Sequence, residues 1–545
     1  MPSIATWAGT ASIKGSSEST RMALLTLSLI GIQFTWGIEM TYCTPYLLKL
    51  GLTKSKVSLV WIAGPISGLI MQPIVGVIAD RSTSPWGRRR PFMVVGTVIV
   101  SICLLILGWT SEIVGVFVSD PDMKRSATIA LAVLSIYGVD FAINAVQAST
   151  RSLVVDTLPI PKQQLGSAWA SRMVSIGGLI GYAAGAMDLS QIFGTSIGDS
   201  QFKQLTVVAA VTICATVGTT CWAVSERVLV SSGRGQDESI GAMATFSQIM
   251  TTALHLPDRI AAICWIQFWC WIGWFPFLFY STTWIGEVYL RYNAPADARD
   301  HADSLGQIGR VGSLSLIVFS LVTFAGSVML PWVIETPTEE TPDFTPRPPA
   351  SIAPFLAELQ KYKPRLITAW SYSHIIFAGS MVSAPFVTSL RSATTIIAMC
   401  GIPWALACWA PFTFMGMEIN RLNSGTDQNR TRKSRGSMEM NSTQSAALLS
   451  HPDNESKDSS SDLAGVYLGI LNLYTTLPQF IGTFISWMVF SILEPGKSPE
   501  LAKEAHPDEH HSKDGPNAIA VCLFIGAVAA LVAAYATNRL DRISR

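Results

Sequence analysis

The chain of 545 residues is 49% apolar and only 14% charged, which favours a lipid-embedded protein over a soluble one of several domains. Its formal net charge of +1 gives no basic field, so the composition argues against nucleic-acid binding. Nine cysteines stand singly, without CxxC pairs, and indicate neither a disulfide framework nor a zinc site.

Long apolar runs recur along the whole chain. A helix of about 20 apolar residues crosses the hydrocarbon core of a bilayer, which is about 30 Å thick. The first 20 residues carry only Lys14 and Glu18 as charges, so the first run is expected to be a retained helix and not a cleaved signal peptide. The runs predict twelve membrane-spanning helices, at about residues 22–48, 57–79, 91–110, 127–150, 168–188, 205–224, 260–283, 311–332, 366–388, 393–415, 463–491 and 517–537.

A polar segment at residues 225–259 separates six of these runs from the other six. Many secondary transporters consist of two such halves related by a pseudo-two-fold axis, with the substrate bound between them. We therefore expect an all-α membrane protein of two six-helix bundles. The expected parts are a cytoplasmic tail 1–21, a first bundle 22–224, a central cytoplasmic loop 225–259, a second bundle 260–537 that contains a disordered cytoplasmic loop 416–462, and a tail 538–545.

Positive charge in the short loops predicts the orientation. Arg81, Arg88, Arg89 and Arg90 lie between the second and third runs, and loops rich in Lys and Arg stay in the cytoplasm. Both termini and the loop 416–462 then lie in the cytoplasm as well. That loop also holds three N-x-S/T sequons, which would be glycosylated only on the opposite side; they begin at Asn429, Asn441 and Asn454. We give the charge rule more weight, because sequons arise by chance in Ser-rich segments.

Glu39 is a carboxylate inside the first apolar run. A charged group at membrane depth is costly and is functional more often than not. Glu39 is therefore a candidate for carrying a proton. A static ion pair with Arg151 or Arg172 explains it equally well, and the sequence does not decide between them.

The fourth run carries a polar stripe. Asp140, Asn144, Gln147 and Arg151 lie at i, i+4, i+7 and i+11, on one face of an α-helix, and are expected to line a cavity. Asp140 and Arg151 are about 16 Å apart along the axis, too far for one ion pair. We expect Asp140 to carry a proton, since burial disfavours the carboxylate, and Arg151 to donate hydrogen bonds to a polar substrate. The alternative is that both form static ion pairs between helices.

The fifth, seventh and eleventh runs add packing and binding candidates. Glycines at positions 177, 181 and 185 form a small-residue stripe that predicts close helix packing.

The seventh run, WIQFWCWIGWFPFLFYSTTW, mixes aromatic rings with an amide, and we expect Gln267 and Trp274 to face the cavity. The alternative for its tryptophans is the bilayer interface. Asn472 and Gln479 in the eleventh run offer further hydrogen bonds, to a substrate or between helices.

The stretch 63–92 reads AGPISGLIMQPIVGVIADRSTSPWGRRRPF and closely resembles the signature of the sucrose–proton symporters of the major facilitator superfamily. The residues STTWIGE in the seventh run resemble the fungal branch more than the plant one, so maltose and other α-glucosides are as plausible as sucrose. Further resemblance, in the same order as in the family, lies at residues 33–50, 140–156, 178–185, 274–289 and 465–479.

The resemblance implies a gate in the basic loop. Asp80-Arg81 and Gly87-Arg88-Arg89 resemble the gating motif of the superfamily, in which the acidic residue holds cations in one conformation and releases them as the halves move. The alternative is that these arginines only set the topology.

The resemblance also implies roles for charged residues. In the related symporters, the residues that match Asp140 and Arg151 serve in proton coupling and sugar binding, and plant members usually have a neutral residue in place of Glu39. Plant members carry an Arg-Glu pair after Trp-x-Gly, whereas here Glu287 follows without the arginine. We expect Glu287 to keep a coupling role. The residues expected to contact the sugar are Arg151, Asn144, Gln147, Gln267, Trp274, Asn472 and Gln479.

The function implied is proton-coupled symport of sucrose or maltose-type α-glucosides by alternating access. No cofactor is expected besides the coupling proton, and the partners are a disaccharide, protons and the lipid bilayer. A monomer in the plasma membrane is expected, with the vacuolar membrane as the alternative location.

A sugar sensor of the same fold, which binds sugar without transporting it, is the alternative function. An enzyme is not expected, because HExxH and Walker motifs are absent.

Overall fold

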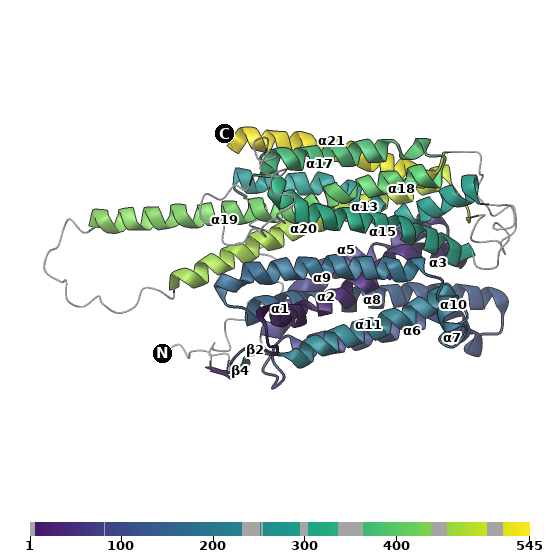
Figure 1. The fold of residues 1–545 in the computed structure, drawn as a ribbon, viewed down its shortest axis with the longest axis horizontal. Coiled ribbons are helices and arrows are strands. Elements are labelled where there is room, and N and C mark those ends of the chain that lie inside the picture. The colour runs from purple at the N-terminus through teal and green to yellow at the C-terminus, as the bar shows by residue number, and fades with distance from the viewer. Residues whose placement is uncertain are drawn as a thin grey trace.

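The computed structural model describes residues 6–80, 82–231, 251, 254, 256–294, 304–335, 363–437, 455–498 and 516–544. Figure 1 shows long helices running side by side along the longest axis of the molecule. Both termini and the projecting end of α19 lie at one end, which we call the inner end, and the opposite end is the outer end. This shared position of the termini agrees with the orientation that the charge rule predicts.

The first half of the chain contains eleven α-helices and one π-helical turn among its described residues. The first predicted span is continuous but changes its winding at Glu39, where the π turn begins. The elements are α1 (Glu18–Thr26), α2 (Ser28–Ile38), η1 (Glu39–Cys43), α3 (Thr44–Lys49), α4 (Lys54–Val60), α5 (Ala63–Asp80), α6 (Arg90–Gly108), α7 (Thr110–Phe117), α8 (Pro121–Thr157), α9 (Ile160–Ala186), α10 (Leu189–Phe193) and α11 (Gln201–Ala223).

The second half repeats one feature of the first. Its first long helix, α13 (Asp258–Val288), also continues into a π turn, η2 (Tyr289–Asn293). A π turn in the leading helix of each half is what two related halves would show. The remaining elements are α15 (Ser304–Val333), α17 (Leu366–Val382), η4 (Ala384–Phe386), α18 (Leu390–Met399), α19 (Gly401–Ser437), α20 (Glu455–Leu493) and α21 (Ala518–Ser544).

A helix occupies each of the twelve positions where an apolar run predicts a span. Ten helical segments in the described part of the chain are long and apolar enough to cross a membrane. The expected spans 168–188 and 366–388 correspond to α9 and α17, which are not among those ten; α17 has only 17 residues. The number twelve therefore stays a prediction.

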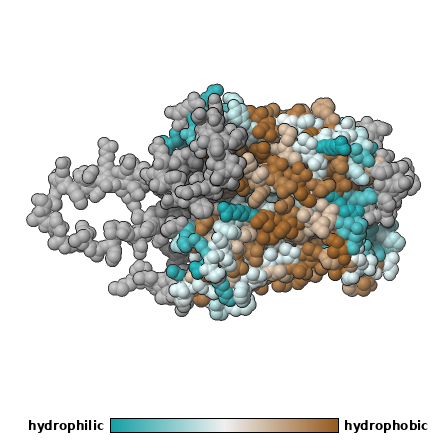
Figure 2. All heavy atoms as spheres, viewed as in Figure 1, coloured by the Kyte–Doolittle hydropathy of each residue, from teal (hydrophilic) through white to brown (hydrophobic). Residues whose placement is uncertain are grey.

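Apolar side chains cover the waist of the molecule. Figure 2 shows brown, hydrophobic residues across the middle and teal or white residues toward the two ends. Large apolar side chains are exposed on several helices in this zone, among them Ile102 of α6, Phe484 of α20 and Val528 of α21. In water such a surface would be unfavourable, whereas hydrocarbon suits it. The chain is an integral membrane protein.

Two predicted loop regions contain regular structure at the inner end. In the predicted tail, β1 (Thr6–Ala8) and β2 (Ser12–Ile13) pair antiparallel with β4 (Val228–Ser231) and β3 (Val224–Ser225), which follow α11. We call this pairing the inner ribbon. The Lys14 ammonium also lies 4.0 Å from the Trp222 ring centroid. The tail is thus held against the start of the central loop.

The loop 416–462 is expected to be disordered, but its described parts are helical. The helix α19 continues to Ser437 and α20 begins at Glu455, because residues 412–437 and 455–477 contain no proline to stop a helix. The sequons at Asn441 and Asn454 lie outside the described residues, as does the side chain of Asn429.

Glycines allow close helix contacts in both halves. In α9, a Cβ at Gly177 would lie 2.7 Å from the carbonyl oxygen of Ile30 in α2, which confirms the close packing predicted from the glycine stripe. In the second half, a Cβ at Gly273 of α13 would lie 2.7 Å from the carbonyl oxygen of Gly526 in α21.

The Gly273→Ala substitution should lower the stability by about 1–3 kcal/mol, because the two backbones must separate to admit a methyl group. Gly218→Ala in α11, where a Cβ would meet nothing within 4 Å, is the matched control. It should be neutral or stabilising by up to about 1 kcal/mol, since alanine favours helix. Thermal unfolding of the purified protein in detergent measures both, and equal effects would contradict the packing role.

Candidate functional site

The polar stripe predicted in the fourth run lies on α8, and its exposure increases toward the inner end. Asp140 is fully buried and Asn144 is 4% exposed, whereas Gln147 is half-buried and Arg151 is exposed. The Asn144 amide donates to the Ser67 hydroxyl of α5 at 2.9 Å and to the main-chain carbonyl of Asp140 at 3.0 Å. The buried end of the stripe is thus fixed to α5, while the Arg151 end is accessible.

Two carboxylates meet in the interior of the first half. Glu39, at the start of the π turn η1, is 3% exposed, and it interacts electrostatically with the fully buried Asp140. None of the four carboxylate oxygens has a hydrogen-bond partner among the described residues. Two neighbouring carboxylates without donors or counter-ions among the described residues are costly to ionise together, so both stay candidates for carrying a proton.

The arginines that the sequence offers as static partners of Glu39 are placed elsewhere. Arg172 lies over the Trp169 ring, with its guanidinium carbon 5.3 Å from the ring centroid. No ion pair joins Glu39 to Arg151 or Arg172 in the part of the chain that the structure describes. The geometry therefore favours the proton over the static ion pair for Glu39.

A buried ion cluster joins the two halves at the outer end. The Lys54 ammonium, at the start of α4, lies 2.5 Å from a carboxylate oxygen of Glu287 in α13 and 2.5 Å from one of Glu494, the residue after α20. All three are less than 5% exposed. Arg291 approaches Glu494 to 3.8 Å, and the Asn517 amide donates to Glu287 at 2.6 Å. We call these five residues the outer cluster.

The outer cluster explains how Glu287 is accommodated without the arginine of the plant pattern. Its counter-charge comes from Lys54, which belongs to the other half of the protein. The sequence reasoning missed Lys54 and Glu494, because residues that are 440 positions apart show no local pattern. One signal was present: a lysine in the first turn of a helix opposes the helix dipole and needs an explanation.

The predicted gating motif forms a second charged network, at the inner end. Arg88 and Arg89 each place a guanidinium nitrogen near one oxygen of Asp156 at the end of α8, at 3.0 and 2.9 Å. Gly87 has a φ of +107°, which glycine adopts without strain, and so turns the chain into α6. Asp80 ends α5, but its side chain and all of Arg81 lie outside the described residues.

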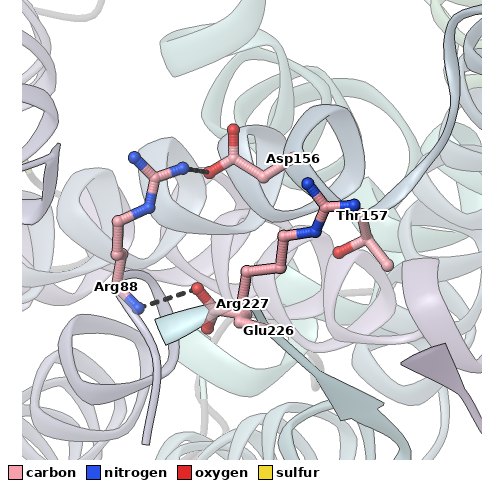
Figure 3. Close-up of a pocket in the computed structure, with 5 residues that line it drawn as sticks. All are labelled: Arg88, Asp156, Thr157, Glu226 and Arg227. Atoms are coloured by element: carbon pink, nitrogen blue, oxygen red, sulfur yellow. Dashed lines mark hydrogen bonds and ion pairs between the residues drawn. The ribbon is translucent and has the colours of Figure 1, made fainter. Parts of the chain in front are cut away.

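Glu226, which the sequence reasoning also missed, caps this network. Its carboxylate accepts the main-chain N–H groups of Arg88, Arg89 and Arg90, each at 2.9 Å, at the N-terminus of α6. A carboxylate at that position satisfies free donors and the positive end of the helix dipole. Figure 3 shows the Arg88 guanidinium directed at Asp156 and its main-chain nitrogen directed at Glu226. A pocket of about 160 Å³ lies here, lined by Arg88, Asp156, Thr157, Glu226 and Arg227.

In the second half, no contact among the described residues joins the candidates for sugar binding to the polar stripe of α8. Gln267 is 3% exposed, and its amide oxygen has no hydrogen-bond partner among the described residues. Trp274 packs inside an aromatic cluster, with ring centroids 4.2 Å from Phe377 and 4.8 Å from Trp404. This packing gives Trp274 a structural role in the conformation described.

The two candidates on α20 differ in what they contact. The Asn472 amide lies 3.5 Å from the amide oxygen of Gln72 in α5, a contact between the halves. The Gln479 amide donates to the Thr475 carbonyl one turn earlier, at 3.0 Å. Asn472 thus stands between the halves, whereas Gln479 makes a local bond.

Comparison with known proteins places the chain among transporters. A family model described as "MFS/sugar transport protein" matches residues 26–287. The general alpha-glucoside permease of Schizosaccharomyces pombe is 30% identical, over 96% of this chain and 94% of the permease. Sucrose transport protein SUC4 of Arabidopsis thaliana is 26% identical, over 89% of this chain and 88% of that protein.

Solved structures show the same fold at low sequence identity. The D-xylose-proton symporter has a TM-score of 0.53 and 12% identity, and the match covers 95% of this chain and 96% of that one. A bacterial homologue of the lysosomal transporter Spinster, in an inward-facing and unoccupied conformation, has a TM-score of 0.54 and 14% identity, with 97% and 98% covered.

Glu226→Ala should destabilise the protein by about 1–3 kcal/mol, because three main-chain donors at the start of α6 lose their acceptor. Glu226→Gln should cost less, since the amide oxygen still accepts. Glu112→Gln is the control: this glutamate pairs with Lys203 but its side chain is 49% exposed, so a change of less than about 1 kcal/mol is expected. Thermal unfolding in detergent compares the three, and a Glu226→Ala protein as stable as the parent would refute the capping role.

Proposed function

Because the chain belongs to the family of MFS/sugar transport proteins, we propose that it carries α-glucosides, with sucrose and maltose as candidates, together with protons by alternating access. Its fold is the major facilitator fold that the sequence predicts. Sugar transport follows from the family, and the chain is a transporter and not an enzyme. The relatives give no support to the sensor alternative.

The observation that carries proton coupling is the buried pair Glu39 and Asp140. A carboxyl pair that lacks donors and counter-ions among the described residues can exchange its proton when water reaches it. Asp140 begins the polar stripe, so a proton bound there lies on the same helix face as Asn144 and Gln147. Proton and sugar would therefore bind on one side of α8.

The accessible end of the stripe supplies groups suited to a sugar. The Arg151 side chain is exposed, which leaves its guanidinium available to a substrate between the halves. Its guanidinium offers several fixed donors for hydroxyl groups, and the Gln147 amide offers a donor and an acceptor. Names of the relatives support α-glucosides as the class, since one is a general alpha-glucoside permease and another a sucrose transport protein.

The positions of the ion pairs support alternating access. Pairs that join the halves lie at the outer end: Lys54 with Glu287 and Glu494, and Arg310 with Asp188 at 3.8 Å. Within the described ranges, the pairs given at the inner end join residues of a single half, namely Arg88 with Asp156, Arg90 with Glu226, Arg259 with Glu418, and Arg365 with Asp541. Such a distribution suits a state closed on the outside, from which the stripe communicates with the inside.

Uptake of labelled sucrose, maltose and trehalose by cells that lack other sugar carriers tests the proposed function. We expect accumulation against a gradient, accompanied by alkalinisation of the medium as protons enter. Accumulation without alkalinisation would refute proton coupling. Binding without any uptake would instead favour the sensor.

Asp140→Asn should abolish accumulation while leaving downhill exchange, because the amide cannot carry the coupling proton. Uptake by the parent should increase as the external pH falls, whereas the variant should show little pH dependence. Asn144→Asp is a useful contrast, since it adds a carboxylate one turn away and does not remove Asp140. Full accumulation with normal pH dependence in Asp140→Asn would refute the assignment.

Glu39→Gln should shift the pH dependence without abolishing coupling. Replacing Glu39 by a neutral amide removes one of the two groups that could share the proton, so the pH of half-maximal uptake should move. Uptake measured between pH 4 and pH 8 gives the midpoint. An unchanged midpoint would show that the two carboxylates do not share a proton.

A further inference from the structure

We propose that Lys54 acts as a latch that keeps the outer end of the protein closed. It holds Glu287 and Glu494 against the first half, and Lys54 separates from both glutamates when the protein opens to the outside. This inference rests on the proposed alternating-access function. It adds two residues, Lys54 and Glu494, to which the sequence and the relatives assign no role.

The contacts of Lys54 identify it as a connection between the halves. Its ammonium bonds at 2.5 Å to each of two carboxylates from the second half, and Lys54 itself is 4% exposed. A lysine shared by two buried carboxylates neutralises charge that either half alone would have to hydrate. The contact therefore favours the closed arrangement of the outer end over an open one.

The local structure around Lys54 is explained by this role. Thr53 caps α4, accepting the Lys56 main-chain N–H at 3.4 Å, and Lys54 is the first residue of the helix. A positive charge there opposes the helix dipole, and Lys54 also loses hydration. A lysine in such a locally unfavourable position is expected where its contact with a distant part of the chain serves the function of the protein.

The second half is organised to receive the lysine. Glu494 also accepts the main-chain N–H of Ala518 at 3.0 Å, at the start of α21, and Asn517 both caps α21 and donates to Glu287. These bonds lie within the second half and do not depend on α4. When the outer end opens, the two glutamates keep them, and Lys54 is the member of the outer cluster that moves away into water.

Small and aromatic residues also let the two halves approach each other closely. A Cβ at Gly309 of α15 would lie 2.2 Å from a ring carbon of Tyr42 in η1, and one at Gly185 would lie 2.5 Å from the Ser313 hydroxyl. The Trp61 ring, directly after α4, lies 4.6 Å from the Phe279 ring of α13, measured between centroids. The contact of Lys54 with the second half is therefore accompanied by close packing between the halves.

A cysteine reporter on α4 measures whether Lys54 keeps the outer end closed. Ser58 lies one turn after Lys54 on α4 and is fully buried. In the Ser58→Cys background, a membrane-impermeant maleimide is applied to whole cells and the labelling rate is measured. The same protein without Ser58→Cys gives the background from the native cysteines, of which Cys214 and Cys408 are exposed.

Lys54→Met should raise the labelling rate of Ser58→Cys by about tenfold, which corresponds to about 1.4 kcal/mol in the balance between closed and open states. Lys54→Arg should keep a low rate, because the guanidinium can also bridge two carboxylates. Lys56→Met is the matched control, since it removes the same charge from an exposed position two residues along the same helix. This control should label like the parent.

Sugar kinetics separate a latch from a merely structural role. A protein biased toward the open outside should show a lower KM for external sugar and a lower maximal rate, since closing becomes the slow step. A structural defect would lower the maximal rate alone. The double variant Lys54→Met/Glu494→Gln should label no faster than Lys54→Met, because the interaction is already lost.

The proposal is overturned if Lys54→Met leaves the labelling rate unchanged, if Lys56→Met raises it equally, or if the double variant is fully additive. Should Lys54→Met not reach the cell surface, Glu494→Gln alone decides: faster labelling supports the latch and an unchanged rate refutes it. Labelling needs no sugar movement, so a parent protein that fails to transport refutes the proposed function and leaves the latch to be judged separately.

Discussion

A charge that is withdrawn from water must meet an opposite charge, a hydrogen-bond donor or a proton, and the polar features of this membrane protein follow from that requirement. At the outer end, Lys54 neutralises glutamates of the other half. At the inner end, Glu226 is satisfied by the main chain at the start of α6. Between them, Glu39 and Asp140 have no such partner among the described residues, which is why we propose that they carry a proton. The same rule thus distinguishes the charges that are paired in the structure from the two carboxyl groups that are not.

Much of the architecture follows from short-range patterns and was predictable. Apolar runs of the length of a bilayer indicate helices, and a helix occupies each expected position. The 3.6-residue period also placed Asp140, Asn144, Gln147 and Arg151 on one face of α8, and exposure increases along that face from Asp140 to Arg151. The cavity that they are expected to line stays a prediction. The tandem glycines predicted a close helix contact on α9, and the structure shows that the partner is α2. In each case the deciding residues lie within a few turns of one another.

Features that depend on distant segments were not predictable. The outer cluster brings together Lys54, Glu287 and Glu494, and nothing near any of them in sequence specifies the others. Glu226 likewise follows the sixth span, while the donors it satisfies precede the third. For Trp274 the sequence leaves two outcomes open, because a ring suited to a sugar is equally suited to its neighbours Phe377 and Trp404, and its contact with sugar stays a prediction. Composition gives the chemistry available to a side chain, and tertiary packing selects its partner.

The inner ribbon affects how the two bundles are tethered. Strands before the first helix pair with the segment Val224–Ser231. This pairing holds the beginning of the linker between the bundles against the first bundle, so the two should move together. The connection between the bundles therefore begins after Ser231, not where α11 ends. It is shorter than the polar segment 225–259, and a shorter connection restricts the relative rotation that the proposed alternating access requires.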